Sequence, residues 1–174
     1  MGHFSNLIKK IRVQFASNEG FIQILRSEGV AIGKNCVINK DVNFGTEPYL
    51  ITIGDNVRVT TGVKLITHDG GLWVPRRLGL VDERADRFGR IIIGSNVNIG
   101  WNVLIMPGVT IGDNCIIGAG AVVTKDIPPN TVAVGVPARI LETIDEYAEK
   151  NKQRLVMTKG MSYEKKKNYL METL

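Results

Sequence analysis

Aliphatic side chains recur at every sixth position along most of this chain. One unbroken run consists of Ile93, Ile99, Ile105, Ile111, Ile117 and Val123. Shorter runs with the same step start at Ile32 and Ile53. A period of six fits no α-helix, whose apolar face repeats every three to four residues, and a β-hairpin does not repeat in one direction. The pattern therefore predicts parallel strands wound into a coil.

Two other positions of each six-residue unit support the coil. Four residues after each aliphatic start, the side chain is again compact and mostly apolar: Cys36, Val42, Val57, Val63, Val97, Val103, Val109, Cys115, Ala121 and Ile127. Three residues after the start stand types that tolerate a positive φ: Asn35, Asp41, Asn56, Gly62, Asn96, Asn102, Gly108, Asn114, Gly120 and Asp126. His68 occupies this turn position in its own unit. We therefore expect short strands separated by tight turns, His68 included.

One unit is too short to bury its own apolar face, so successive coils must stack at a spacing of about 4.8 Å. The predicted fold class is mainly β, a parallel β-helix of hexapeptide repeats over residues 31–137 with an inserted loop at about 71–91. Residues 1–30 are a predicted helical cap, and residues 138–174 a helical extension. Within the cap, one helical face would carry Phe4, Leu7, Ile8 and Ile11. Contact of that face with a membrane surface is an alternative that no other feature supports.

Composition limits the function classes. The chain has 174 residues, of which 44% are hydrophobic, enough for a substantial core. Its net charge of +5 suits an anionic partner, but the basic stretches lack nucleic-acid-binding signatures, so no nucleic acid is expected. Cys36 and Cys115 fall on core positions, which indicates neither a disulfide framework nor a zinc knuckle and fits the cytoplasm. The sequence shows no membrane span and no signal peptide.

Several motifs resemble a known family. They are PGVTIGDNCIIGAGAVVTKDIPPNTVAVGVPARI, FGTEPYLITIGDNV and ITHDGG. The first resembles the left-handed β-helix hexapeptide acyltransferases, in the branch of galactoside, maltose and xenobiotic acetyltransferases. The other two are similar to capsular and lipopolysaccharide O-acetyltransferases. The resemblance implies a left-handed β-helix, acetyl-CoA as the co-substrate, no required metal and a homotrimer.

His68 is the candidate general base. The chain has two histidines, His3 near the N-terminus and His68 directly before the long loop. Acyl transfer from a thioester to a hydroxyl needs a group that takes a proton near neutral pH, which is the range of histidine. The resemblance places His68 in the family's catalytic motif. The alternative is that His68 only fills a turn, as Asn and Gly do in sister units.

A base histidine needs a second group that fixes its tautomer and stabilises the imidazolium. Glu47 lies in a short insertion of the preceding coil and could approach the same edge, so we favour it as the catalytic partner. Asp69 is adjacent in sequence but should point elsewhere along an extended backbone. Asn43 matches an asparagine that the galactoside enzymes place beside the acceptor, which implies acceptor binding, with a structural turn role as the alternative.

The long loop carries charges of both signs: Arg76, Arg77, Asp82, Glu83, Arg84, Asp86, Arg87 and Arg90. It is either a self-neutralised surface loop or an acceptor-binding element. In the second case Trp73 would stack on a sugar ring while an arginine holds an acidic substituent. The sequence leaves both open.

For coenzyme A, the resemblance implies a pantetheine arm along the coil backbone, where small residues leave room for it. The residues concerned are Gly100, Trp101, Gly118 and Ala119. Relatives often carry their tryptophan at the position of Asn98, so Trp101 departs from the pattern. Thr124, Lys125 and Arg139 match positions near the nucleotide end, where cations meet phosphates. A further basic position of the galactoside enzymes is Glu142 here.

Repeat phase separates the two halves of this site. His68 belongs to the third unit of its coil, whereas Gly100 and Gly118 belong to second units. In a three-sided coil they would lie at different edges, so one chain would not close the site. We therefore expect a homotrimer with active sites between subunits.

The leading hypothesis is O-acetylation of a saccharide hydroxyl, on a polysaccharide or lipopolysaccharide unit or its precursor. N-acetylation of a sugar amine or a small xenobiotic is the alternative enzyme. A zinc enzyme on the same coil would need three histidines, which His68 alone does not supply. A nonenzymatic scaffold is the third hypothesis, which the GAGAVVTKD run and His68 oppose.

Overall fold

The computed structural model describes residues 12–174. They divide into two compact units, one ending at Ile144 and the other comprising Asp145–Leu174. Residues 12–15 are helical, while His3 and the apolar positions Phe4, Leu7, Ile8 and Ile11 lie outside the described residues. Among the described helices, none is both long enough and apolar enough to cross a membrane.

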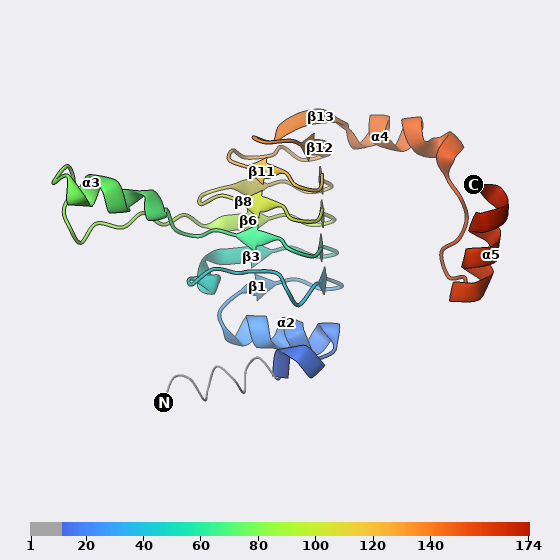
Figure 1. Cartoon of the computed structure of the whole chain (residues 1–174), viewed down its shortest axis with the longest axis horizontal. Helices are drawn as coiled ribbons and strands as arrows, with labels where there is room; N and C mark the ends of the chain where they lie inside the picture. Colours follow the sequence, from blue (N-terminus) through green and yellow to red (C-terminus); the bar gives the residue numbers. More distant parts are fainter. Residues whose placement is uncertain (1–11) are drawn as a thin grey trace. The chain divides into compact units, whose positions relative to one another are not determined.

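Short strands of the first unit form three sheets of parallel strands. Sheet A consists of β1 (Ala31–Ile32), β3 (Ile51–Ile53), β6 (Ile91–Ile93) and β9 (Thr110–Ile111). Sheet B consists of β2 (Val37–Ile38), β4 (Arg58–Val59), β7 (Asn98–Ile99), β10 (Ile116–Ile117), β12 (Thr131–Val134) and the antiparallel β13 (Arg139–Thr143). Sheet C consists of β5 (Lys64–Leu65), β8 (Leu104–Ile105) and β11 (Val122–Val123). From β3 to β11 the chain visits sheets A, B and C in turn, which makes a parallel β-helix (Figure 1).

Strand register stacks the aliphatic positions one above another. Ile93 pairs with Ile53 on one side and Ile111 on the other, and Ile99 pairs with Ile117. Members of the unbroken run are each at most 1% exposed: Ile93, Ile99, Ile105, Ile111, Ile117 and Val123. Both cysteines are free and buried. The six-residue pattern therefore predicted the core correctly.

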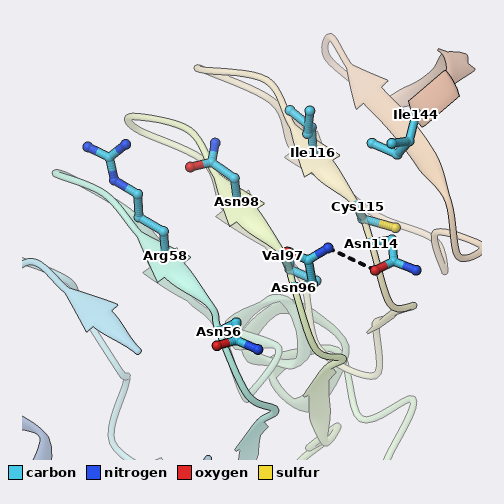
Figure 2. A pocket seen from close by; sticks show the side chains of 9 residues that line it. All are labelled: Asn56, Arg58, Asn96, Val97, Asn98, Asn114, Cys115, Ile116 and Ile144. Carbon is cyan, nitrogen blue, oxygen red and sulfur yellow. Dashed lines mark hydrogen bonds between the residues drawn. The ribbon is translucent and has the colours of Figure 1, made fainter. Parts of the chain in front are cut away.

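Asparagines at the corner between sheets A and B form a ladder along the stack. Asn96 Nδ2 donates to Asn114 Oδ1 at 2.9 Å (Figure 2). Asn114 Nδ2 in turn donates to Asn130 Oδ1 at 2.8 Å. Each of these asparagines has a positive φ. The same residue thus serves the tight turn through its backbone and the coil contact through its side chain.

Three predicted turn positions lack the positive φ expected for them: Asp41, Asp126 and His68. Asp41 and Asp126 accept hydrogen bonds from the backbone of a neighbouring coil, from Gly62 N and Thr110 N. His68 forms an antiparallel bridge with Phe88, because the chain leaves the coil here to enter the loop. The prediction that His68 occupies a left-handed turn was wrong.

Helix α2 (Asn18–Ser27) covers the first coil, as predicted for this stretch (Figure 1). Its buried residues Phe21, Ile22 and Leu25 join the core. The Asn18 amide donates to Cys36 O at 2.8 Å and accepts from Ile38 N at 3.0 Å, as a neighbouring strand would. The helix therefore satisfies the open edge of the first coil.

At the other end of the stack, residues 139–143 differ from the prediction of a helical extension that starts at 138. They form β13, which pairs antiparallel with β12. The β-branched residues Ile140 and Thr143 suit a strand, and the unpaired side of β12 provides a partner. The helical part starts later and comprises α4 (Ile144–Asn151), η3 (Lys152–Arg154) and α5 (Tyr163–Thr173).

Two insertions interrupt the coil. The shorter one contains η1 (Pro48–Leu50) between sheets C and A. The longer one contains η2 (Gly70–Leu72) and α3 (Trp73–Arg77), and it projects sideways from the stack in Figure 1. Both leave the coil at the corner where sheet C passes to sheet A, so they are neighbours in successive coils.

Candidate active site

A short antiparallel stem at the base of the long loop holds His68. Asp69 N donates to Arg87 O and Gly89 N donates to Thr67 O, both at 2.9 Å. The Arg87 guanidinium pairs with the Asp69 carboxylate at 3.2 Å. Asp69 therefore points to the loop and not to the His68 ring, as the sequence predicted. The backbone of His68 is fixed from both sides.

Glu47 reaches His68 from the shorter insertion. Its Oε2 lies 3.2 Å from His68 Nδ1. The Glu47 side chain is 16% exposed, whereas that of His68 is 47% exposed. The structure therefore brings together the two residues that the sequence paired, with the carboxylate set back and the imidazole at the surface.

Two threonines that the sequence analysis missed also contact Glu47. Thr46 Oγ1 donates to Glu47 Oε1 at 2.6 Å, and Thr67 Oγ1 donates to Glu47 Oε2 at 2.7 Å. These hydroxyls, and less strongly His68, hold the pKa of Glu47 below its ordinary value of 4.5. The carboxylate is thus kept ionised, an acceptor that suits a His68 ring protonated on Nδ1.

In this tautomer the neutral imidazole has its lone pair on Nε2. The Phe88 ring lies beside the imidazole, with 6.2 Å between centroids and a tilt of 56°. The Phe88 ring on one side and the Glu47 carboxylate at Nδ1 restrict rotation of the His68 ring. Chemically, such a group can take a proton from a hydroxyl or amine placed at Nε2.

Asn43 has a structural bond of its own. Its Oδ1 accepts from Gly45 N at 2.7 Å, which closes an Asx turn at the start of the shorter insertion. Its side-chain amide group remains at the exposed surface of sheet C, where Asn43 bridges to Lys64. The turn role is therefore present, and contact with an acceptor stays a prediction.

Trp73 lies in the projecting loop and is 61% exposed. The Arg77 guanidinium lies 4.9 Å from the centre of its ring. Together with Arg76 and Glu83 they line a cavity of about 390 Å³. Arg76 pairs with Asp86 and Arg84 with Asp82, so part of the loop is self-neutralised, as one of the two interpretations required.

The residues predicted to contact coenzyme A do not gather in one place on a single chain. Gly100 and Trp101 follow β7, and Gly118 and Ala119 follow β10, so all four lie where sheet B passes to sheet C. Thr124 and Lys125 follow β11 and share the corner of His68. Arg139 opens β13 and donates to Ala138 O.

Gly100 is required by coil stacking. A Cβ on Gly100 would lie 2.6 Å from Ala119 N and 2.8 Å from Ile117 O, which belong to the next coil. Coil stacking therefore explains this glycine without a ligand, and the room for a ligand that the sequence suggested stays a prediction. A different feature fits an amide-containing arm: Ala119 is an exposed residue, and within residues 12–174 its N–H makes no hydrogen bond. Trp101 beside it is 61% exposed.

Another groove lies on the outer face of sheet B. Figure 2 shows its lining: Asn56, Arg58, Asn96, Val97, Asn98, Asn114, Cys115, Ile116 and Ile144. It contains none of the predicted site residues, and two of its asparagines, Asn96 and Asn114, bond each other in the ladder. No group of three His, Cys, Asp or Glu that could hold a metal occurs in the described part of the chain.

Comparisons with known proteins agree with the repeat fold. Residues 90–125 match the family described as hexapeptide repeat of succinyl-transferase. Protein CapG of Staphylococcus aureus is 46% identical over 149 residues, which are 84% of this chain and 85% of CapG. The galactoside O-acetyltransferase of Escherichia coli is 45% identical over 117 residues, which are 67% of this chain and 55% of that enzyme.

Solved structures give the same result. A hexapeptide-repeat-containing acetyltransferase from Vibrio cholerae, also solved with acetyl coenzyme A, has a TM-score of 0.66 at 28% identity, over 78% of this chain and 86% of that one. A galactoside acetyltransferase in complex with coenzyme A has a TM-score of 0.57 at 31% identity, over 80% and 78%. These neighbours imply that the β-helix is left-handed. Together with the relatives above, they place this chain in the hexapeptide-repeat acetyltransferase family.

Proposed function

We propose that this protein transfers an acetyl group from acetyl-CoA to a hydroxyl of a saccharide, with His68 as general base. The observation that carries the proposal is the contact between Glu47 Oε2 and His68 Nδ1 at the corner between sheets C and A. It combines an exposed imidazole with an ionised partner. The names of the relatives add support, since one is a galactoside O-acetyltransferase.

Acetyl-CoA supplies the acetyl group as a thioester. His68 Nε2 accepts the proton of the acceptor hydroxyl while its oxygen attacks the thioester carbonyl. The imidazolium then returns that proton to the departing sulfur, so no net proton is gained or lost. Glu47 stabilises the imidazolium through Nδ1 in the interval. A base of this kind contributes typically 10²–10⁴-fold to a rate.

Gly100, Trp101, Gly118 and Ala119 form our proposed surface for the pantetheine arm. The free N–H of Ala119 supports this, because an amide carbonyl of the arm would satisfy it. Thr124, Lys125 and Arg139 are exposed polar or cationic groups that suit the phosphates of the nucleotide end.

We propose that the active site closes only in a homotrimer. The separation of the His68 corner from the Gly100 and Gly118 corner supports this, since a neighbouring subunit would bring the two together. Sedimentation velocity measures the assembly directly. A monodisperse, fully active monomer would contradict the composite site.

Trp73 is our candidate platform for a sugar ring, and Asn43 a second acceptor contact. The exposed indole, the adjacent Arg77 and the carboxylate of Glu83 combine a stacking face with hydrogen-bonding groups, a combination suited to a saccharide. An arginine without a carboxylate partner would also attract an acidic substituent.

An acetyl-CoA consumption screen tests the function across glycans, glycan precursors and amines. We expect turnover with a saccharide hydroxyl acceptor and none with the His68→Ala protein, which should still bind coenzyme A in calorimetry. Preferred turnover of amines would favour N-acetylation. Substantial activity of His68→Ala would remove His68 from the mechanism.

A further inference from the structure

We propose that Thr67 is a positioning residue that aligns Glu47 with His68 and thereby selects the His68 tautomer with a free Nε2. The inference rests on the proposed role of His68. The repeat pattern does not explain the buried hydroxyl of Thr67. Equivalent positions of sister units carry residues such as Lys34, Asp55 and Ser95, which are not buried, whereas Thr67 is 0% exposed.

The hydrogen-bond geometry gives Thr67 a defined task. Its Oγ1 donates at 2.7 Å to the same Glu47 oxygen, Oε2, that faces His68 Nδ1 at 3.2 Å. Thr67 and His68 are consecutive residues, and the hydroxyl and the imidazole both face this one carboxylate oxygen. A carboxylate held this way cannot turn away from Nδ1 without losing the bond to Thr67.

Thr67 is better anchored than the other hydroxyl on Glu47. Thr46 is exposed and lies next to Glu47 in the insertion, so water can replace its bond to Oε1. The carbonyl of Thr67 accepts from Gly89 N, which ties the residue to the loop stem. Gly45 packs against it so closely that a Cβ there would lie 3.1 Å from Thr67 Oγ1. The buried hydroxyl is therefore the fixed reference point of the pair.

Kinetics of Thr67→Val provide the first test. Removing a hydrogen bond to a charged group should lower kcat about tenfold, with the KM for acetyl-CoA changed less than about twofold. Thr67→Ser keeps the hydroxyl and should restore kcat to within about threefold of the parent. Thr131→Val is the matched control, because Thr131 is also buried but its hydroxyl donates to Pro128 O, away from both corners proposed to form the site. It should leave kcat unchanged.

A double-mutant cycle then separates positioning from folding. If Thr67 acts through Glu47, Thr67→Val should have no further effect in a Glu47→Gln background. The proposal would be overturned if the losses in kcat of the two single variants multiplied in the double variant. A Thr67→Val protein with the kcat of the parent would overturn it as well. Thr67→Ala replaces Thr67→Val if the valine does not pack.

A spectroscopic signature works without turnover. With two histidines in the chain, ¹⁵N-labelled imidazole signals can be assigned by comparison with His68→Ala. The parent should show His68 protonated on Nδ1, and Thr67→Val a mixture of both tautomers. An unchanged tautomer in Thr67→Val refutes the positioning role even if His68 is catalytic. Conversely, Thr67→Val could shift the His68 tautomer while the His68→Ala protein stays active. That result would overturn the proposed catalytic role of His68 and leave the positioning of Glu47 by Thr67 intact.

Discussion

Gly100→Ala distinguishes a glycine needed for coil stacking from one needed for a ligand. The new Cβ would meet backbone atoms of the next coil, Ala119 N at 2.6 Å and Ile117 O at 2.8 Å. No side-chain rotation relieves this contact. Overpacking of this kind costs about 1–3 kcal/mol. The hydrogen bond from Gly100 N to Ile117 O, now 2.8 Å, would lengthen as the coils separate and lose about 1 kcal/mol. Together we expect a loss of about 2–4 kcal/mol.

Urea unfolding at fixed protein concentration measures this loss. With an m-value of about 2 kcal/mol per M, the midpoint should fall by about 1–2 M. Gly118→Ala is the matched control, since its Cβ would meet Val134 Cγ1 at 2.7 Å, a side-chain atom that can move. Its cost should be about 0.5–1.5 kcal/mol. An unchanged midpoint for Gly100→Ala, combined with weaker coenzyme A binding, would refute the stacking explanation.

Two further outcomes follow from the ladder and from Glu47. Asn114→Gly should be more stable than Asn114→Ala by about 1–2 kcal/mol. Both variants lose the ladder bonds, but only alanine is strained at the φ of 56°. A higher urea midpoint for Asn114→Ala would contradict this. Because the pKa of Glu47 is lowered on folding, its carboxylate stabilises the fold above the ordinary value of 4.5, and this contribution is lost as pH falls through the folded pKa. The parent should therefore have a higher urea midpoint than Glu47→Gln at pH 7, and this difference should shrink as the pH is lowered into the acid range. A difference that grows in acid would exclude the stabilising role of the Glu47 carboxylate.

The repeat was predictable because every unit carries the same physical demand. An inward side chain such as Ile105 must be apolar, and a corner such as that of Asn102 must accept a positive φ, so the sequence shows both at a fixed period. The pairing of Glu47 with His68 was also accessible, since both precede re-entry into sheet A in successive coils. Repeat phase alone was enough to place them at one corner.

Features outside the period were harder to predict. The φ of His68 follows from its bridge to Phe88, twenty residues away, and no local pattern shows that bridge. Thr67 occupies a position that is not buried in sister units, so its burial depends on the loop stem and on the shorter insertion. Strand β13 depends on the free side of β12, which is a property of the last coil and not of the segment 139–143 itself.

The two ends of the stack have a consequence for how such a chain can change in length. Asn18 mimics a strand against the first coil, and β13 closes sheet B by running against the direction of the others. A bare end would instead recruit another strand and grow without limit. Each inner coil contacts only its two neighbours, and equivalent positions such as those of Asn96 and Asn114 are 18 residues apart. Whole coils between helix α2 and strand β13 can thus be gained or lost in evolution while the structures that close the two ends stay the same.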